Sequence, residues 1–157
     1  MNPLLFVYGT LLSSVDHPMS RRLAREAELL GEATFTGRLY RVAWYPGLVD
    51  GENGDVVHGE LYRLKDPEPA FIRLDEFEGV TRGTSSVTEQ DEYARVERTV
   101  QTDTGATGAW VYLFRDDVTV LQRVAPGRWD QRSEREGKSL RDPGRSGSGR
   151  ARPVRRR

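Results

Sequence analysis

Apolar and polar residues alternate along much of the chain, and this alternation predicts a series of β-strands. We expect strands at Leu4–Tyr8, Glu32–Val42, Leu48–Val49, Val56–Leu64, Tyr93–Thr102 and Ala106–Phe114. The first segment is apolar throughout, which is typical of a strand buried on both faces. The last two segments are joined by Asp103-Thr104-Gly105, a hairpin signal. Gly37 is a candidate β-bulge in the second strand.

Helical spacing predicts two helices between these strands. The first is expected to be capped by Asp16, to begin at Pro18 and to end at Gly31. Its apolar face comprises Met19, Leu23, Ala27 and Leu30. The second helix is expected to begin at Pro67 and to end at Gly79. Its apolar face comprises Phe71, Leu74 and Phe77.

The predicted order of elements is β-α-β-β-β-α-β-β, which indicates an α+β protein. Strands follow one another with two helices interspersed. This order favours a mixed, largely antiparallel sheet or small barrel over a doubly wound parallel sheet. The chain has 157 residues, enough for one domain.

The zero net charge of the chain conceals two parts of opposite sign. Residues 133–157 carry 9 basic and 3 acidic side chains, whereas residues 1–132 carry 15 basic and 21 acidic ones. After Trp129 the sequence is rich in Arg, Ser and Gly and almost devoid of apolar residues, which predicts disorder. We therefore expect a folded domain over residues 1–130 and a basic tail over residues 131–157. The tail could neutralise phosphates of RNA or of an anionic surface, or could be a solubilising extension; nucleic acid is not the expected partner.

Several classes of site are excluded by the residues that are missing. The chain has no cysteine, which excludes thiol catalysis, disulfides and thiolate metal sites. It contains no GxxxxGKS/T, no GxGxxG and no GxSxG motif. The two histidines, His17 and His58, lie 41 residues apart and make a weak metal site. No apolar run approaches the roughly 20 residues of a membrane span, and Met1–Val7 has no basic region of a signal peptide, so we expect a cytoplasmic protein.

One segment that could carry chemistry is FVYGTLL, at residues 6–12. A buried strand that ends in Tyr8-Gly9-Thr10 presents successive backbone N–H groups at the end of the sheet. Such groups can hold a carboxylate or a developing oxyanion. Gly9 allows a close approach of a ligand or a positive φ angle. The alternative interpretation is an ordinary exit from a strand into a turn.

The other segment is LDEFEG, at residues 74–79, where three carboxylates crowd the C-terminal turn of the second helix. The helix dipole disfavours anions at this end. Glu78 follows Leu74 by four positions, so it lies beside the apolar face, where burial and like charge make a carboxyl hold its proton more readily. Such a carboxyl suits general acid/base chemistry near neutral pH. The alternative, a solvated acidic helix end, is reasonable for Glu76, and Asp75 is expected on the side of Glu78.

Six segments in a fixed order carry a resemblance to a known family. They are FVYGTLL, YPGLV, VHGELYRL, LDEFEG, YARVERTV and WVYLF, and they extend from about Leu4 to Phe114. In this order the chain resembles the gamma-glutamylcyclotransferase-like, or avirulence-induced-gene-like, family. The resemblance implies a small mixed α/β barrel with its pocket at one end.

The resemblance also implies an activity and the residues that perform it. Characterised members cleave a gamma-glutamyl amide, because the α-amine of the substrate attacks the γ-carbonyl to give 5-oxoproline and a free amine. The implied general acid/base is Glu78, and no metal or organic cofactor is implied. The implied substrate-binding residues are Tyr8, Gly9, Thr10, Leu11, Tyr93 and Tyr112. Arg95 belongs to the same Y-x-R motif as Tyr93, and the alternative for it is a surface ion pair.

We therefore expect an acyltransferase or lyase that forms 5-oxoproline from a small gamma-glutamyl substrate. The alternative is a protein that binds a small carboxylate-bearing metabolite on the same fold without turnover. Residues 12–17 depart from the Gly-rich stretch of many relatives, and the loop at residues 79–92 could be a lid or an insertion. We expect no membrane partner and a monomer or weak dimer.

Overall fold

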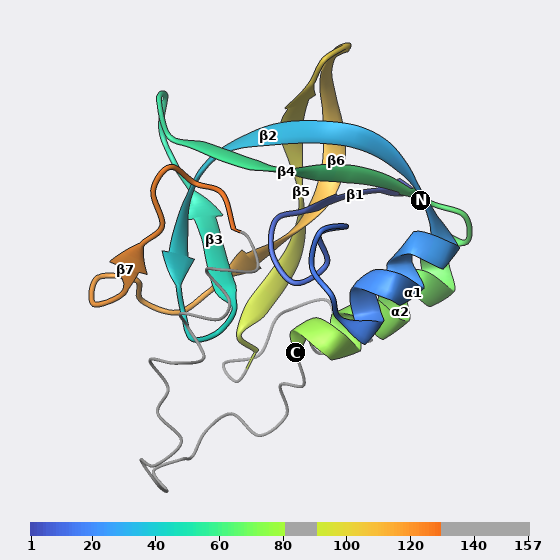
Figure 1. Cartoon of the computed structure of the whole chain (residues 1–157), viewed down its shortest axis with the longest axis horizontal. Helices are drawn as coiled ribbons and strands as arrows, with labels where there is room; N and C mark the ends of the chain where they lie inside the picture. Colours follow the sequence, from blue (N-terminus) through green and yellow to red (C-terminus); the bar gives the residue numbers. More distant parts are fainter. Residues whose placement is uncertain (81–90, 130–157) are drawn as a thin grey trace, which may run out of the picture.

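The computed structural model of the chain describes residues 1–80 and 91–129 (Figure 1). The elements are β1 (Leu4–Val7), α1 (Pro18–Glu26), β2 (Ala27–Arg41), β3 (Pro46–Asp50), β4 (Val56–Leu64), α2 (Pro67–Glu78), β5 (Tyr93–Thr102), β6 (Gly105–Phe114) and β7 (Gln122–Arg123). Most of the predicted loop at residues 79–92 and all of the predicted tail lie outside the described residues.

Five strands close into a small barrel in the order β2-β4-β1-β6-β5, with β5 returning to β2. Neighbouring strands of this ring are antiparallel except β1 and β6, which are parallel. β3 and β7 pair with β2 outside the ring. The prediction of an α+β fold with a small mixed, largely antiparallel barrel and two helices is confirmed.

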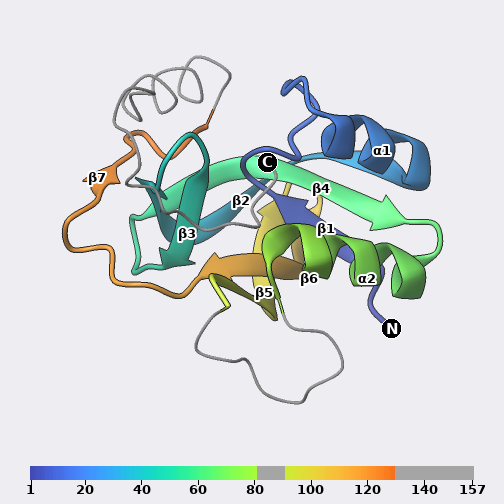
Figure 2. The same cartoon turned by 90° about the horizontal axis from the view of Figure 1, so that it is seen from below.

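The two helices lie together at one end of the molecule, with β3 and β7 at the opposite end (Figure 1, Figure 2). An ion pair of 2.9 Å joins Arg73 in α2 to Glu26 at the end of α1. The ring of His17, just before α1, lies 5.6 Å from the ring of Phe77 in α2. None of the helices in the described part of the chain is long and apolar enough to cross a membrane.

β1 is one of the five strands of the ring and lies between β4 and β6. Its residues Leu5, Phe6 and Val7 are at most 3% exposed, which confirms the prediction of a strand buried on both faces. The chain then continues directly into Tyr8–Leu11. Because β1 is held on both sides, the position of this exit segment relative to the barrel is set by the strand.

The first helix is shorter than predicted. α1 ends at Glu26, whereas the sequence predicts an end at Gly31. From Ala27 onward the chain forms β2, where Ala27 pairs with Leu64 of β4. The helical spacing of the apolar residues was therefore a wrong guide after Glu26, because pairing with β4 outweighs the local preference for helix.

The N-cap of α1 is also a different residue from the predicted one. The side chain of His17, not that of Asp16, caps the helix: its Nδ1 accepts a hydrogen bond of 3.0 Å from the backbone N–H of Met19. The Asp16 carboxylate pairs instead with Arg21. His17 therefore has a structural role at this helix end.

The irregularity in β2 lies near its beginning and not at Gly37. The pairing with β4 shifts between Leu29 and Gly31, where Gly31 has a φ of 136°. Gly37 pairs regularly with Asp50 of β3, so the prediction of a bulge there is wrong. β3 extends beyond the two residues predicted for it. β7 was not predicted, since two residues are too few to show a pattern.

The second helix has the predicted bounds. α2 begins at Pro67, and Gly79 ends it in the left-handed conformation, with a φ of 79°. The N–H of Val80 donates a hydrogen bond of 2.8 Å to the carbonyl of Asp75. This C-cap satisfies carbonyls of the last turn, and it makes Glu78 the last residue of the helix.

Tyr62 of β4 makes the free energy of unfolding depend on pH in the alkaline range. Burial raises the pKa of Tyr62 to about 12, and the charge of Glu60 acts in the same direction. The unfolded chain loses this proton near pH 10, so the contribution of Tyr62 to stability is present below about pH 10 and lost as the pH rises to about 12. We expect the free energy of unfolding in urea to fall between pH 9 and about pH 11, and to fall less steeply in Tyr62→Phe. Equal slopes in the two proteins would contradict this assignment.

Candidate active site

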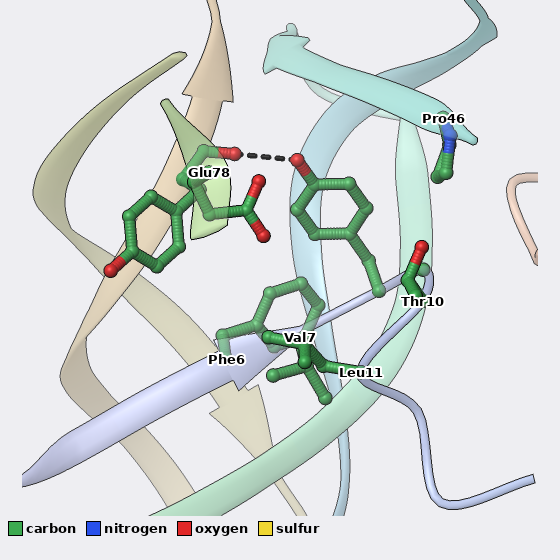
Figure 3. Close-up of a pocket in the computed structure, with 9 residues that line it drawn as sticks. Phe6, Val7, Thr10, Leu11, Pro46 and Glu78 are labelled. Carbon is green, nitrogen blue, oxygen red and sulfur yellow. Dashed lines mark hydrogen bonds between the residues drawn. The ribbon is translucent and has the colours of Figure 1, made fainter. Parts of the chain in front are cut away.

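A pocket lies where the chain leaves β1 (Figure 3). Its cavity has a volume of about 20 Å³, and the empty space rises to about 300 Å³ only when the part open to solvent is included. The residues that line it are Phe6, Val7, Tyr8, Gly9, Thr10, Leu11, Pro46, Glu78 and Tyr112. They come from β1 and its exit, the start of β3, the end of α2 and β6.

Glu78 brings a carboxyl group to this pocket. It is 5% exposed, and its carboxylate points from α2 toward the exit of β1 (Figure 3). Glu76, two residues earlier in the same turn, is exposed, whereas Asp75 is buried. The phase of the helix thus separates these three acids as the sequence predicts.

The exit of β1 forms the facing wall. A turn begins here, in which the N–H of Leu12 donates a hydrogen bond of 2.9 Å to the carbonyl of Gly9. The hydroxyl of Tyr8 donates a bond of 2.6 Å to the backbone carbonyl of Tyr112, which ties this wall to β6. Thr10 is 2% exposed, and its hydroxyl has no hydrogen-bond partner among the described residues. A buried hydroxyl without a partner is costly unless a ligand or water supplies one.

Pro46 closes one side of the pocket against Gly9. A Cβ atom on Gly9 would lie 2.6 Å from Cγ of Pro46, so the close approach made possible by this glycine is that of Pro46. The hydroxyl of Tyr93 donates a bond of 2.6 Å to the Pro46 carbonyl. The hydroxyl of Tyr45 donates a bond of 2.9 Å to Glu92. Glu92, just before β5, and Tyr93, its first residue, thereby hold Pro46 and the residue before it in place.

Substitution of Gly9 by alanine is expected to move Pro46 and to distort the pocket. Overpacking of this kind costs about 1–3 kcal/mol, and the added methyl group would meet a rigid ring held through Tyr93. We expect a lower melting temperature and weaker binding of any pocket ligand. Thermal unfolding and ligand titration of Gly9→Ala measure both effects. Gly108→Ala is the matched control, because a Cβ there meets nothing within 4 Å.

Tyr112 of β6 completes the pocket wall next to Glu78. Its hydroxyl donates a hydrogen bond of 2.6 Å to Asp75. Burial raises the pKa of Tyr112 well above its ordinary value, and the charges of Asp75 and Glu78 act in the same direction. The phenol therefore stays protonated at neutral pH and serves as a hydrogen-bond donor.

The structure brings six of the seven predicted site residues to one pocket, and Tyr93 is the exception. Its side chain is fully buried and contacts Pro46 rather than the pocket itself, as far as the described residues show. Sequence reasoning missed Pro46, which lies in the YPGLV segment and was given no role in the site. The Tyr45-Pro46-Gly47 motif indicates a rigid segment of backbone at Pro46. Its contact with Gly9 depends on the path of the chain through the barrel, which the motif does not show. The catalytic and binding roles of these residues remain predictions.

The described residues contain no group of three or more His, Asp or Glu side chains that could hold a metal ion. His58 lies in β4, away from the lining of the pocket, and its backbone N–H donates a bond of 2.8 Å to the carbonyl of Gly127. The described lining of the pocket offers one carboxyl group, phenol and hydroxyl groups, and the backbone of the β1 exit.

A family model described as gamma-glutamyl cyclotransferase, AIG2-like, matches residues 5–131. The chain belongs to this family. A comparison with curated protein sequences gave no match. The gamma-glutamyl cyclotransferase, AIG2-like match covers all the pocket residues and all the described strands and helices, apart from Leu4 at the start of β1.

Solved structures agree with the membership of this family. Protein ytfP from Escherichia coli is similar at 31% identity with a TM-score of 0.57, over 82% of this chain and 97% of that one. An AIG2-like protein from Mus musculus is similar at 20% identity with a TM-score of 0.60, over 82% of this chain and 88% of that one. A solved gamma-glutamyl cyclotransferase is similar at 20% identity with a TM-score of 0.53, over 76% and 68%. At 20% identity the last two show the shared fold alone.

Proposed function

We propose that this chain cyclises a gamma-glutamyl amide, either a gamma-glutamyl amine or a gamma-glutamyl dipeptide, to 5-oxoproline with release of the free amine. The observation that carries the proposal is that the buried carboxyl of Glu78 shares one pocket with the chain segment Gly9–Leu11. A proton shuttle facing backbone N–H donors is what an acyl transfer to an internal amine requires. Membership of the gamma-glutamyl cyclotransferase, AIG2-like family supports the same reaction.

In the proposed reaction one C–N bond forms and another breaks. Glu78 takes a proton from the α-ammonium group of the substrate, and the freed amine attacks the γ-carbonyl carbon. Backbone N–H groups at the exit of β1 hold the negative charge that develops on the carbonyl oxygen. Glu78 then returns the proton to the leaving nitrogen as its bond to carbon breaks. The attacking nitrogen loses its second proton through the same carboxylate to the released amine, which leaves as its ammonium ion. The products are 5-oxoproline and the amine, and the carboxylate is regenerated.

The remaining pocket residues are proposed to hold the glutamyl group in a reactive geometry. Ring closure is intramolecular, so positioning of the amine against the carbonyl supplies much of the lowering of the barrier. The rings of Tyr8 and Tyr112 form walls, and the hydroxyl of Thr10 offers the hydrogen bond that it lacks within the described residues. Tyr93 acts on the pocket through the carbonyl of Pro46.

The experiment that tests this function is an assay of 5-oxoproline release from a panel of gamma-glutamyl compounds. The panel contains gamma-glutamyl amines, gamma-glutamyl dipeptides, glutathione and gamma-glutamyl-ε-lysine, with α-glutamyl isomers as controls. We expect release from at least one gamma-glutamyl compound and from none of the α-isomers. Binding of 5-oxoproline or of a gamma-glutamyl compound in calorimetry, without any product, would replace catalysis by the binding-protein alternative.

A further inference from the structure

Arg95, Asp75 and Tyr112 form a chain of polar contacts beside the candidate site. Nε of Arg95 donates a hydrogen bond of 2.8 Å to Oδ1 of Asp75, and Nη2 donates one of 3.1 Å to Oδ2. The hydroxyl of Tyr112 donates a bond of 2.6 Å to the same Oδ1. Tyr112 lines the pocket, so the chain leads from the pocket wall to a guanidinium group that lies behind it.

The guanidinium of Arg95 is held in a narrow slot. Its central carbon lies 4.3 Å from the ring centre of Phe71 in α2 and 4.5 Å from that of Trp110 in β6. Arg95 and Tyr112 are direct partners across β5 and β6, so their side chains leave the same face of the sheet. A planar guanidinium between two aromatic rings, with a carboxylate held at two points, has little freedom to turn.

Asp75 connects this chain to the catalytic end of α2. It precedes Glu78 by three residues, so both side chains project from the same side of the last helical turn. The Asp75 side chain is 10% exposed and that of Arg95 17%, and a paired charge with this little solvent contact costs several-fold more to break than an exposed one. The ion pair thus joins the helix turn that carries Glu78 to the barrel.

We propose that Arg95 and Asp75 are positioning residues of the candidate site, which fix the Tyr112 hydroxyl and the last turn of α2 and so set where the carboxyl of Glu78 lies in the pocket. The inference rests on the proposed function for its kinetic consequences. Its structural consequences can be measured without any substrate.

The ion pair also controls the charge near Glu78. Titratable groups near Glu78 come from α2, from the exit of β1, from β6 and, through the ion pair, from β5: they are Asp75, Glu76, Tyr8, Tyr112 and Arg95. Burial lowers the pKa of Arg95, but the hydrogen bond to Asp75 and the nearby negative charge outweigh burial and raise it, so the guanidinium stays charged. The pair is therefore neutral overall. Loss of Arg95 would leave the carboxylate of Asp75 without this cation, three residues before Glu78.

The test is the variant Arg95→Gln, with Arg98→Gln as its matched control. Arg98 lies on the same strand and also makes a two-point ion pair, with both bonds to Asp50 at 3.0 Å. That pair is exposed, with 39% and 53% of the two side chains accessible, and neither residue lines the pocket. The same substitution on the same strand therefore removes, in Arg95→Gln, an ion pair that is connected to Glu78 and, in Arg98→Gln, one that is not.

We expect Arg95→Gln to lower kcat for 5-oxoproline formation by about 10- to 100-fold, with a smaller change in KM, because the reacting groups are misplaced. The acidic limb of its pH profile should move to higher pH, since an uncompensated carboxylate favours protonation of its neighbour. Arg95→Lys should restore the limb but only part of the rate. Arg98→Gln should match the unsubstituted protein. A wild-type kcat and pH profile in folded Arg95→Gln would overturn the proposal.

Asp75→Asn gives a second test with the opposite sign. The carboxamide has the same size but no charge, so the positive charge of Arg95 is left uncompensated near Glu78. The acidic limb should then move to lower pH, opposite to its movement in Arg95→Gln. General damage to the fold would move the acidic limbs of the two variants in the same direction. That result would overturn the proposal. This arm also serves if Arg95→Gln fails to fold.

Crystal structures separate this inference from the proposed function. If the unsubstituted protein converts no gamma-glutamyl compound, the proposed function fails while the structural part of the inference stands to be tested. In Arg95→Gln we expect the Tyr112 hydroxyl and the Glu78 carboxyl to be displaced, and in Arg98→Gln we expect them unmoved. Unmoved side chains in Arg95→Gln would overturn the positioning role.

Discussion

Replacement of Glu78 by glutamine is expected to lower kcat for 5-oxoproline formation by about 10²- to 10⁴-fold, the usual contribution of a general acid/base. Glutamine has nearly the same shape and fills the same buried place at the end of α2, but it cannot take a proton from the substrate ammonium. Binding should change little, so the loss belongs to kcat rather than to KM. Release of 5-oxoproline, measured by chromatography under saturating substrate, gives the rate.

Glu76→Gln is the matched control for this experiment. It makes the same change in charge two residues earlier in the same helical turn, on an exposed side chain that does not line the pocket. We expect its rate to equal that of the unsubstituted protein. Wild-type turnover in Glu78→Gln would remove Glu78 from the mechanism, and equal losses in both variants would indicate an effect of helix charge only.

Replacement of Trp129 by alanine is expected to cost about 3–5 kcal/mol of the free energy of unfolding. Trp129 is 1% exposed, and the Arg41 guanidinium of β2 lies 5.3 Å from its ring. The chain before it is held to the barrel by a bond of 2.8 Å from Val124 N–H to the Leu39 carbonyl. Since a domain of this size is stable by about 5–15 kcal/mol, the variant should be marginal. Urea unfolding at neutral pH measures the loss.

Deletion of residues 133–157 provides the counterpart to this substitution. We propose that residues 1–130 are the folded and catalytic unit, and the deletion removes none of the described residues of the pocket or of the core. The free energy of unfolding and the turnover should therefore both be unchanged. A large loss of turnover on deletion, or a cost below about 1 kcal/mol for Trp129→Ala, would place the boundary of the functional unit elsewhere.

The fold could be predicted best where local signals and long-range pairing agree. α2 has its Pro67 start, its apolar face and its Gly79 stop in the sequence, and all three operate in the structure. The hairpin of β5 and β6 is similar, because its turn and both strands are local. α1 shows the limit: Ala27 continues the helical spacing, but its partner Leu64 lies in a strand 37 residues later. A single-sequence pattern contains no information about that partner.

The candidate site divides in the same way. Glu78 could be singled out from helical phase alone, because its distance from Leu74 places it beside the apolar face. The need for a glycine at position 9 could be predicted, but the reason for it could not. Pro46 comes close to Gly9 only through the path of β3 outside the ring. The alternative of a surface ion pair for Arg95 is wrong in its location. Its partner Asp75 is buried, and that follows from the packing of α2 against β6.

The one parallel contact in the described barrel, between β1 and β6, has a consequence for synthesis on the ribosome. It joins Leu5 to Trp110, and the hydroxyl of Tyr8 reaches the carbonyl of Tyr112 across 104 residues. A nascent chain can pair β1 with β4, but the other edge of this apolar strand lacks its partner β6 until nearly the whole domain has emerged. Such long-range pairing is intrinsically slow. The pocket is consequently among the last features to assemble, and an arrested chain that ends before β6 should expose one edge of LLFV to chaperones and proteases.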